Sequence, residues 1–447
     1  MVDPVSGDFI LSARTLWRRP DVLDLRLLRT EPETIKDALL KRMDSVDFSP
    51  IFTLDEQRRA LIGSVESTRA ERKGYAKQIG RLRGQGGDWQ ALEAEATALK
   101  AQLATLEAEL SATEKALHES LIELPNYPDP RIPAGGKENN RVVRTWGERP
   151  SLGDDALDHV ALSQTLGLID YERGTKLGGN GFWMYSGHGA ALEWALLDFF
   201  CREHRADGYR FCLPPHLLVE ECGYTAGQFP KFRDDVFHLD TNEGERARFL
   251  LPTAETAILN VYRDEILPGD KLPQKLFAYT PCYRREAGSY RSEERGTIRG
   301  HQFNKVEMFQ FCTPAQAEAG LEEMVGKAQS LVEKLGLHYQ TTLLAAKDAS
   351  ASMAMTYDVE VWLPSMNVFK EVSSISWARD YQARRAKIRY RPEGEKKTEF
   401  VHTLNGSGLA TSRLVPAILE QNQRPDGSVL VPEPLREWLG TDVLRPE

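Results

Sequence analysis

The sequence has few of the features that anchor a protein in a membrane, cross-link it or coat nucleic acid. It has five cysteines in 447 residues and no CxxC pair, so neither a zinc knuckle nor a disulfide framework is indicated, and reduced thiols in the cytoplasm are expected. No apolar run approaches the roughly eighteen residues of a membrane span. The formal net charge of −9 argues against indiscriminate nucleic-acid binding, so any RNA contact must come from local basic patches.

What the sequence does contain is an unusual basic stretch, residues 279–309 (YTPCYRREAGSYRSEERGTIRGHQFNKVEMF). The segment before its loop, Phe277 to Arg284, is apolar and aromatic, and the segment after it, His301 to Phe311, is rich in Phe and Val. An antiparallel strand pair joined by an arginine-rich loop is predicted. The planar guanidinium of arginine can hold a carboxylate and a phosphate oxygen together, which joining an amino acid to the α-phosphate of ATP requires.

This stretch resembles motif 2 of class II aminoacyl-tRNA synthetases. In the form Cys282-Tyr283-Arg284-x-Glu286-Ala287-Gly288-Ser289 with His301-Gln302-Phe303, it is similar to seryl-tRNA synthetases. The resemblance covers nearly the whole chain from residue 22. It implies an α+β fold in which an antiparallel-sheet catalytic domain with helices follows a long antiparallel helical coiled-coil arm. The predicted domains are residues 22–135, with the arm at about 53–124, and residues 136–447.

The first 21 residues precede VLDLRLLR at 22–29, which resembles the usual start of a bacterial family member. Residues 1–21 are therefore interpreted as an N-terminal extension. Three arginines and few carboxylates hint at a transit peptide, but the early aspartates and the shortness favour a start-site choice or a local tail.

Two heptad segments predict the arm. Apolar positions step by alternating four and three residues, which is the seam of a coiled coil, and a Gly-rich turn at 84–87 separates the two segments. The seams are Leu54, Arg58, Leu61, Val65, Thr68, Arg72, Tyr75, Ile79 and Leu82, then Leu92, Ala96, Leu99, Leu103, Leu106, Leu110, Thr113, Leu117, Leu121 and Leu124. Each helix of about 30 residues would span roughly 45 Å.

The arm has a basic first helix and an acidic second helix. Such charges can simply solvate a hairpin and form ion pairs across it. The resemblance adds a second interpretation, because in seryl-tRNA synthetases the arm reaches the long variable arm of the tRNA across a homodimer. Candidate phosphate contacts are then Arg69, Lys73, Lys77 and Arg81. The dimer itself would involve motif 1, which a helix over 190–204 and a short strand within 208–215 resemble; a core helix followed by a strand is an equal alternative.

Four separated segments carry the expected chemistry. Thr253-Ala254-Glu255 resembles the serine-binding TxE, in which the carboxylate takes the substrate ammonium; a helix N-cap at Thr253 is the alternative. Glu307 is expected to face the serine hydroxyl, and its alternative is a cross-strand ion pair. A buried carboxylate without a donor costs about 1–3 kcal/mol or more, so this position would discriminate against alanine.

The ATP site is expected around motif 2. Arg284 would bridge the serine carboxylate and the α-phosphate, and Phe303 would stack on adenine. Glu286 would accept from the adenine amino group or position the arginine, and Arg299 would meet the distal phosphates. The resemblance also assigns Arg285 to this ATP site.

The third segment, Phe369 to Ser374, followed by Gln382-Ala383-Arg384-Arg385, resembles the EVSS and QARR of the family. It implies ATP contacts from Glu371, Val372, Ser373 and Ser374, with Glu371 and Ser374 as Mg²⁺ ligands. On a regular strand Ser374 faces away from Glu371, so a bulge or twist is needed to bring it to the metal. An edge strand followed by a basic surface turn is the alternative.

The fourth segment, residues 404–413, matches motif 3. Its glycines allow close backbone approach to a ligand. Arg413, at the start of a helix, would reach the γ-phosphate and, with Arg284, act in catalysis. Asn405 and Ser407 would line the serine pocket.

Together these segments imply formation of seryl-adenylate from L-serine and ATP, followed by transfer to tRNA(Ser), and to tRNA(Sec) where present. The sequence has no convincing Ser/His/Asp or Cys/His constellation, and none is needed, because positioning and charge neutralisation suffice. His301 and His402 are interpreted as structural. Two rival classes are a ligase that loads a carrier protein, which has no use for the arm, and a noncatalytic coiled-coil binding module, against which the complete motif set argues.

Several positions depart from the family pattern. Ile375 and Trp377 stand where Cys and Asn are usual, and Ser412 and Met355 replace a usual Gly and a usual Lys or Arg. The loop at 290–295 also differs. An altered surrounding of the serine pocket is therefore expected, and the hypothesis is a specialised second copy that tolerates a seryl-adenylate-like antibiotic or serves a biosynthetic pathway.

Overall fold

The computed structural model describes residues 23–153, 155–242, 246–286 and 295–446. These form two compact units, one made of residues 47–124 and the other of residues 23–46 and 125–446. The predicted extension, residues 1–21, lies outside the described residues, and the predicted domain limits stay predictions. Within the described ranges, no helix combines the length and apolar character needed to span a bilayer.

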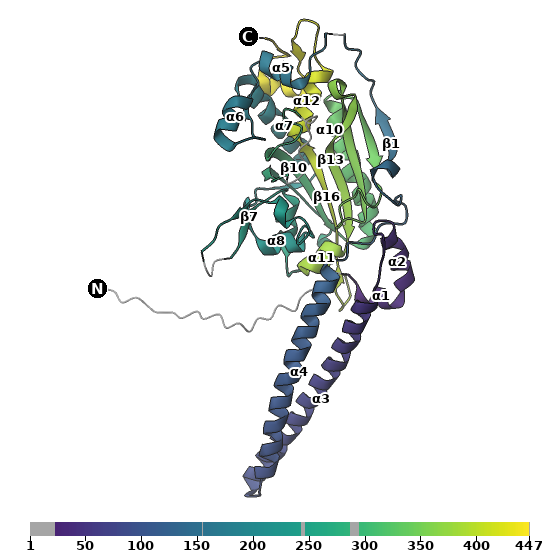
Figure 1. Ribbon diagram of the computed structural model, residues 1–447, viewed down its shortest axis with the longest axis vertical. Helices are drawn as coiled ribbons and strands as arrows, with labels where there is room; N and C mark the ends of the chain where they lie inside the picture. The colour runs from purple at the N-terminus through teal and green to yellow at the C-terminus, as the bar shows by residue number, and fades with distance from the viewer. Residues whose placement is uncertain (1–22, 154, 243–245, 287–294, 447) are drawn as a thin grey trace, which may run out of the picture. The chain divides into compact units, whose positions relative to one another are not determined.

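The first unit is a hairpin of two long helices, α3 (Ser49–Gln85) and α4 (Gln90–Ile122) (Figure 1). All of the predicted seam residues except Arg72 are buried or half-buried. Gly86 caps α3 at a φ of 68°, a left-handed conformation that glycine adopts without strain. The predicted coiled-coil arm is confirmed.

Ion pairs cross this hairpin at three levels. They join Arg58 to Glu114 at 3.2 Å, Arg69 to Glu107 at 2.6 Å and Arg83 to Glu93 at 2.7 Å. The interpretation of the charges as cross-hairpin pairs therefore holds for part of the basic helix. Such exposed pairs contribute about 0–1 kcal/mol each, so the apolar seam carries most of the stability.

The second unit is built on an eight-stranded sheet. Its strand order is β1-β11-β12-β13-β16-β10-β9-β4. Neighbours are antiparallel except β4 and β9, which are parallel, and this confirms the predicted α+β class. The bounds are β1 (Arg141–Trp146), β11 (Tyr339–Leu343), β12 (Met355–Leu363), β13 (Val368–Arg379), β16 (His402–Ala410), β10 (Gln302–Cys312), β9 (Gln274–Tyr283) and β4 (Arg210–Cys212).

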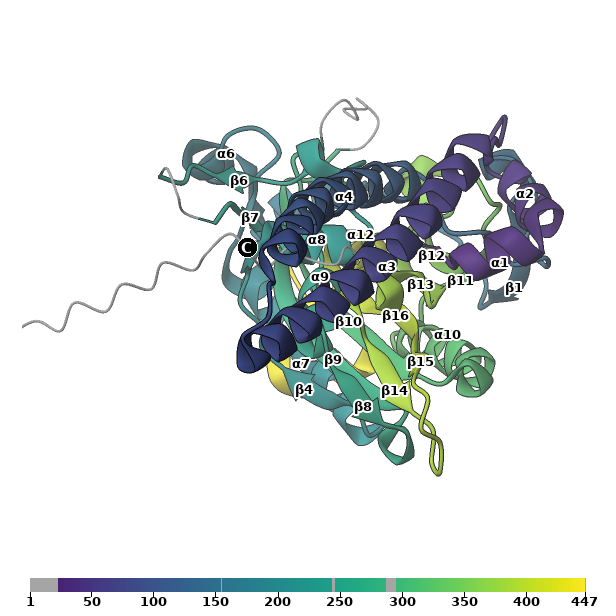
Figure 2. The same cartoon turned by 90° about the horizontal axis from the view of Figure 1, so that it is seen from below.

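One face of this sheet packs against the hydrophobic core and the other lines a cavity, as the side chains of β10 illustrate. Val306 and Met308 point into the main core, beneath helices α7 (Gly187–Ala206), α10 (Ala317–Lys334) and α12 (Thr411–Gln421). Lys305 and Glu307 alternate with them and line a cavity on the opposite face. Figure 2 shows β9, β10, β16 and β13 side by side at the centre of the unit. The predicted strand pair of motif 2 is therefore the floor of a polar site.

Shorter elements complete the second unit. Helices α1 and α2 are held to its body by Arg42, which donates to the carbonyls of Ala351 and Met353 at 3.0 and 2.9 Å. The remaining helices are α1 (Leu25–Thr30), α2 (Pro32–Leu40), α5 (His159–Thr165), α6 (Tyr171–Gly178), α8 (Glu220–Thr225), α9 (Glu255–Ile258), α11 (Tyr381–Ala386) and α13 (Arg436–Leu439). The 3₁₀ helices are η1 (Lys137–Asn139), η2 (Arg233–Asp235), η3 (Leu259–Tyr262), η4 (Gly269–Lys271), η5 (Pro314–Gln316), η6 (Pro364–Met366) and η7 (Glu433–Leu435). The small sheets comprise β2 (Ile169–Asp170) with β3 (Met184–Tyr185), β5 (Leu217–Val219) with β7 (Arg248–Leu250) and β6 (His238–Leu239), β8 (Ile266–Pro268) with β14 (Arg389–Arg391) and β15 (Glu399–Phe400), and β17 (Val429–Leu430) with β18 (Val443–Leu444).

Candidate active site

A cavity of about 630 Å³ lies on the polar face of the large sheet. Strands β10, β13 and β16 supply nine of its 25 lining residues, and loops and α12 supply most of the others, which places segments that are far apart in the sequence around one space. The predicted site residues that line it are Thr253, Glu255, Arg284, Glu286, Arg299, Phe303, Glu307, Glu371, Ser374, Asn405, Ser407 and Arg413.

Four predicted residues do not line this cavity. Ala254 and Val372 are buried in hydrophobic clusters, and Ser373 is buried within the sheet. Arg285 is exposed, and its backbone nitrogen donates to the Asp235 carbonyl at 2.8 Å. Their roles in ATP binding stay predictions.

A β-bulge in β13 sets the position of Ser374. The register with β12 shifts between the pairs Val359–Ser373 and Glu360–Glu371, so Val372 is the extra residue. The side chain of Ser373 is buried within the sheet and donates to the Ser407 carbonyl at 2.5 Å. The side chains of Glu371 and Ser374 both line the cavity. The bulge that the metal-site prediction required is present.

One end of the cavity contains the half-buried carboxyl of Glu255. Its Oε1 accepts from Gln382 Nε2 at 2.6 Å and from Asn405 Nδ2 at 2.8 Å. Burial, and then the negative charge of Glu307, raise the pKa of Glu255 to about 7. A carboxyl held in this way gains its charge readily when a cation enters, so this end is suited to an ammonium group.

Lys305 lies between the acidic groups. Its Nζ is 2.6 Å from Glu307 Oε2 and donates to Thr253 Oγ1 at 2.7 Å. The Thr253 side chain does not cap α9, whose N-cap residue is Ala254, and the ion pair of Glu307 is made within its own strand. Sequence reasoning missed Lys305, although it lies two positions from Glu307 and must share its face of the strand.

Arg284 lies beside the aromatic wall. Its guanidinium carbon is 5.2 Å from the centre of the Phe303 ring, a cation–π arrangement. Its Nε donates to the Pro252 carbonyl at 3.3 Å, next to Thr253. Arg284 is thus held between the flat surface of Phe303 and the acidic end of the cavity.

Two further arginines are fixed by carboxylates. Arg299 contacts Glu286 Oε2 through Nη2 at 2.5 Å and Nε at 2.8 Å, and Glu286 itself has a left-handed φ of 49°. Arg413 Nη1 donates to the Glu371 carbonyl at 2.9 Å and lies 3.3 Å from Glu371 Oε2. Both guanidiniums line the cavity in defined orientations, because each is held by its carboxylate partner.

Behind Glu371 and Ser374 lies a buried carboxyl that the sequence did not reveal. Asp358 pairs with Ser374 in the register of β12 and β13, and its Oδ1 has no hydrogen-bond partner among the described residues. Burial, and then the charge of Glu371, raise the pKa of Asp358 well above its usual range. No group of three or more His, Cys, Asp or Glu residues in a metal-binding arrangement occurs in the described part of the chain.

The departures from the family pattern lie mostly outside the cavity wall. Ile375 and Trp377 point into the core beneath the sheet, as does Met355. Gly406 faces the same way, because a Cβ there would lie 3.0 Å from Ile375 Cγ1. Gly406 and Gly408 therefore permit close packing beneath the sheet, and their backbone approach to a ligand stays a prediction. Ser412 does line the cavity, whereas residues 290–294 of the unusual loop lie outside the described residues.

The four arm cations are all exposed on α3. Arg69 is paired with Glu107, whereas Lys73, Lys77 and Arg81 form no ion pair with any residue that the structure describes. These three lie toward the tip of the hairpin, and they are therefore the better candidates for phosphate contacts.

Comparison with known proteins identifies the family. A model of the seryl-tRNA synthetase N-terminal domain matches residues 22–128, and a model of the class II tRNA synthetase core domain (G, H, P, S and T) matches residues 237–422. Serine–tRNA ligase 2 of Clostridium acetobutylicum is 57% identical to the chain over 425 residues, which cover 95% of the chain and all of the relative. The chain belongs to the seryl-tRNA synthetase family.

Other members of the seryl-tRNA synthetase family match over similar lengths. The serine–tRNA ligase of Citrifermentans bemidjiense is 42% identical, with 94% of the chain and 99% of the relative covered. Among solved structures, the seryl-tRNA synthetase of Pyrococcus horikoshii complexed with ATP superposes with a TM-score of 0.87 at 30% identity, covering 95% of the chain and all of that structure. The predicted family and the class II fold are confirmed.

Proposed function

We propose that the chain acts as a serine–tRNA ligase that activates L-serine with ATP and transfers the seryl group to tRNA(Ser), and to tRNA(Sec) where present. The observation that carries this proposal is the meeting of two carboxyl groups, the half-buried Glu255 and the buried Glu307, with Arg284 in one cavity. An amino acid needs an acidic partner for its ammonium and a cationic partner for its carboxylate. Both partners are present within a space large enough for a nucleotide.

Serine would bind at the acidic end. Its ammonium would interact with Glu255, and its hydroxyl would donate to Glu307, whose negative charge Lys305 already balances. Asn405 and Ser407 line the same end and would contact the rest of the amino acid. Alanine lacks the hydroxyl that would donate to Glu307. Because water would not easily reach Glu307 once the amino acid is bound, the carboxylate would be left without that donor.

ATP would occupy the remainder of the cavity. Adenine would stack on Phe303, and Arg284, which lies over that ring, would bridge the serine carboxylate and the α-phosphate. Arg413 and Arg299 would neutralise the distal phosphates. In this arrangement Glu286 orients Arg299 through two contacts, and we assign it that role in preference to adenine recognition.

The donor set next to Arg413 fits Mg²⁺. Glu371 and Ser374 offer hard oxygen ligands on one face of β13 because of the bulge, and Asp358 has a carboxylate oxygen without a hydrogen-bond partner in the described structure behind them. Mg²⁺ commonly takes one or two protein ligands and fills its remaining positions with phosphates and water. When bound, the ion would neutralise phosphate charge.

The reaction would proceed by direct displacement. A carboxylate oxygen of serine attacks the α-phosphorus, the bond to the β-phosphate oxygen breaks, and pyrophosphate leaves with the electron pair. A hydroxyl of the terminal tRNA adenosine then attacks the activated carbonyl and AMP leaves. Arg284 holds the two reactants in line and neutralises the charge that develops, so no side chain of the enzyme forms a covalent bond.

Dimer formation and tRNA binding are part of the same proposal. Trp194 on α7, Phe211 on β4 and the following Leu213 are 52%, 41% and 71% exposed. A patch of large apolar side chains at one edge of the sheet favours burial against a second copy. The tRNA would lie across the two subunits, with Lys73, Lys77 and Arg81 contacting its phosphates, and the tRNA substrate favours a cytoplasmic location.

A second candidate function concerns the biological role. The relative that is 57% identical bears the numeral 2 in its name, whereas the 42% identical ligase has none. We therefore propose that the chain is a second, specialised copy that confers tolerance to a seryl-adenylate-like inhibitor or serves secondary metabolism. If adenylate analogues inhibit the purified protein as strongly as they inhibit a single-copy family member, the tolerance version is wrong.

Serine-dependent exchange between ATP and pyrophosphate, with and without tRNA, tests the main function. We expect exchange with serine alone and formation of seryl-tRNA when tRNA(Ser) is added. A binding module gives no exchange, and a carrier-protein ligase gives exchange but no aminoacyl-tRNA. Either of these results would refute the proposal.

A further inference from the structure

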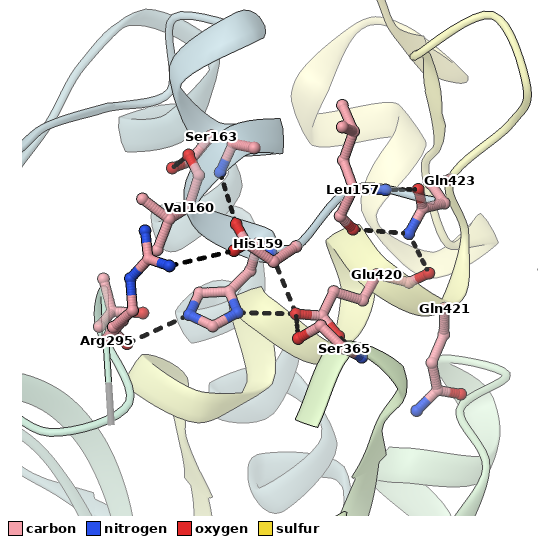
Figure 3. Close-up of polar contacts among 12 residues, drawn as sticks. Leu157, His159, Val160, Ser163, Arg295, Ser365, Glu420, Gln421 and Gln423 are labelled. Atoms are coloured by element: carbon pink, nitrogen blue, oxygen red, sulfur yellow. Dashed lines mark hydrogen bonds and ion pairs between the residues drawn. The ribbon is translucent and has the colours of Figure 1, made fainter. Parts of the chain in front are cut away.

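His159, outside the cavity, joins two segments that build the ATP end of the site. Its side chain is 5% exposed and lies at the start of α5. Figure 3 shows the ring between Glu420 and Arg295. Its Nδ1 is 2.7 Å from Glu420 Oε1, and its Nε2 is 3.1 Å from the Arg295 carbonyl oxygen. Glu420 belongs to α12, and Arg295 begins the segment that leads into β10. The imidazole therefore bridges α12 and residues 295–299, the segment of motif 2 that leads into β10.

Glu420 is the centre of a buried hydrogen-bond cluster that includes the His159 ring. Glu420 also accepts from the backbone nitrogen of His159 at 3.0 Å and from the nitrogen and hydroxyl of Ser365 at 2.9 and 2.7 Å. Burial alone would raise the pKa of Glu420, but these hydrogen bonds outweigh it and hold the pKa below its ordinary value.

The segment held by His159 is also attached directly to α12, at two consecutive residues. Thr297 Oγ1 donates to the Ser412 carbonyl at 2.6 Å, and the Ile298 carbonyl accepts from Arg413 Nε at 3.1 Å. Arg299 follows directly and lines the cavity with Arg413. A shift at Arg295 would therefore move both of the arginines proposed for the distal phosphates.

The backbone at Gly296 packs directly against the start of α5, which is independent evidence that residues 295–299 are fitted to His159. It has a left-handed φ of 67°, and a Cβ there would lie 2.8 Å from His159 Nε2 and 2.9 Å from Val160 Cγ2. Only glycine combines that backbone conformation with that contact. The chain thus passes directly against the imidazole just before it enters the cavity.

We propose that the ion pair of His159 and Glu420 is a positioning device that holds residues 295–299, and hence Arg299 and Arg413, in the orientation that binds the ATP phosphates. The inference rests on the proposed function, because it assigns those arginines to ATP. Neither residue of the pair touches substrate. Loss of the imidazole would release both the Arg295 carbonyl and the Glu420 carboxylate, so ATP binding would weaken.

Other charged groups near the pair oppose each other. Asp158 Oδ2 lies 3.7 Å from Arg295 Nη1, so this acid and base partly cancel. Tyr171 on α6 lies near Asp158 and Arg295, and burial raises its pKa above the ordinary value. Glu420 is the acidic side chain in direct contact with the His159 ring.

The test measures the ATP Kd by calorimetry and the KM values for ATP and serine in pyrophosphate exchange, for full-length wild type and the His159→Gln and Glu420→Gln variants at one pH. We expect His159→Gln to raise the ATP Kd and KM about tenfold, the effect of one charge-assisted hydrogen bond, with serine KM changed less than twofold. Glu420→Gln should likewise weaken ATP binding, with little effect on the KM for serine.

The matched control is His338→Gln. His338 is also buried, its Nδ1 lies 2.8 Å from the Trp146 carbonyl, and its backbone nitrogen donates to Gln421 of α12 at 2.8 Å, but it does not contact residues 295–299. If His159→Gln does not fold, Ser365→Ala, which removes one donor to Glu420, should give a smaller loss of ATP affinity. An unchanged ATP Kd, or equal losses for ATP and serine, would overturn the inference. Absence of exchange in wild type with normal ATP binding would refute only the proposed function.

Discussion

Lys305 Nζ lies 2.6 Å from Glu307 Oε2, two positions away on the same face of β10, and both side chains are almost fully buried. The pair neutralises itself inside a cavity that also holds Glu255. A buried charge that has its partner is tolerated, whereas removing one partner leaves the other charge unpaired and destabilises the folded protein by about 3–5 kcal/mol. Glu307 is thus tied to stability as well as to the proposed recognition of serine.

Replacement of Glu307 by Gln should separate these two roles. The amide keeps an acceptor for the serine hydroxyl but leaves Lys305 without its anion. We expect kcat/KM for serine to fall about 10- to 200-fold, corresponding to roughly 1–3 kcal/mol, with ATP KM nearly unchanged, and the midpoint of urea unfolding to decrease. Adding Lys305→Met should restore the midpoint but not serine activation. Equal loss of ATP and serine affinity would contradict the proposed role.

The carboxyl of Glu255 predicts how serine binding depends on pH. Burial and the charge of Glu307 raise its pKa to about 7, so below pH 7 it is increasingly protonated and loses its attraction for the substrate ammonium. Serine KM should therefore rise about tenfold per pH unit below 7, with little change in ATP KM. A serine KM that stays constant between pH 6 and 8 would show that Glu255 is not the ammonium partner.

The same shift predicts a change in stability of the free enzyme. A carboxyl whose pKa is raised on folding contributes its full stability below the unfolded pKa near 4.5, and that contribution is lost as the pH rises through 7. The loss is on the order of 3 kcal/mol for a shift of this size. Glu255→Gln should therefore be more stable than wild type at pH 8 and not at pH 5, by urea denaturation in the absence of serine, while losing serine activation. Asp426→Asn, an exposed carboxyl with a lowered pKa, is a control with the opposite sign.

Periodicity predicted the coiled-coil seam and the β9–β10 pair because each is a local pattern repeated over many residues. The orientation of Ser374 depends on a bulge at Val372 that the sequence does not mark. The pairing of His159 with Glu420 joins positions 261 residues apart, so only the fold brings them together. Lys305 is different, since alternation along β10 was sufficient to place it beside Glu307.

Ile375 tests the idea that departures from the family pattern reshape the serine pocket. Its side chain points beneath the sheet and would lie 3.0 Å from a Cβ at position 406. Ile375→Cys should therefore destabilise the protein by about 1–2 kcal/mol, because it leaves a small cavity in the core, while serine KM changes less than twofold. Ser412→Gly, which alters the cavity wall, is the matched comparison. A large change in serine KM for Ile375→Cys would mean that the core beneath β13 and β16 transmits its shape to the pocket.

The exposed cations of α3 provide a test of tRNA binding that is independent of the cavity. Combined replacement Lys73→Glu and Lys77→Glu should raise the KM for tRNA and lower the salt dependence of that KM by about two phosphate contacts, because each contact contributes about one to the slope. Pyrophosphate exchange without tRNA should stay at the wild-type rate. Lys100→Glu, an exposed lysine of α4, controls for net charge and should leave the KM for tRNA near the wild-type value. If Lys100→Glu raises the KM for tRNA as much per charge as the α3 replacements do, the arm acts through its overall charge and α3 makes no specific contact.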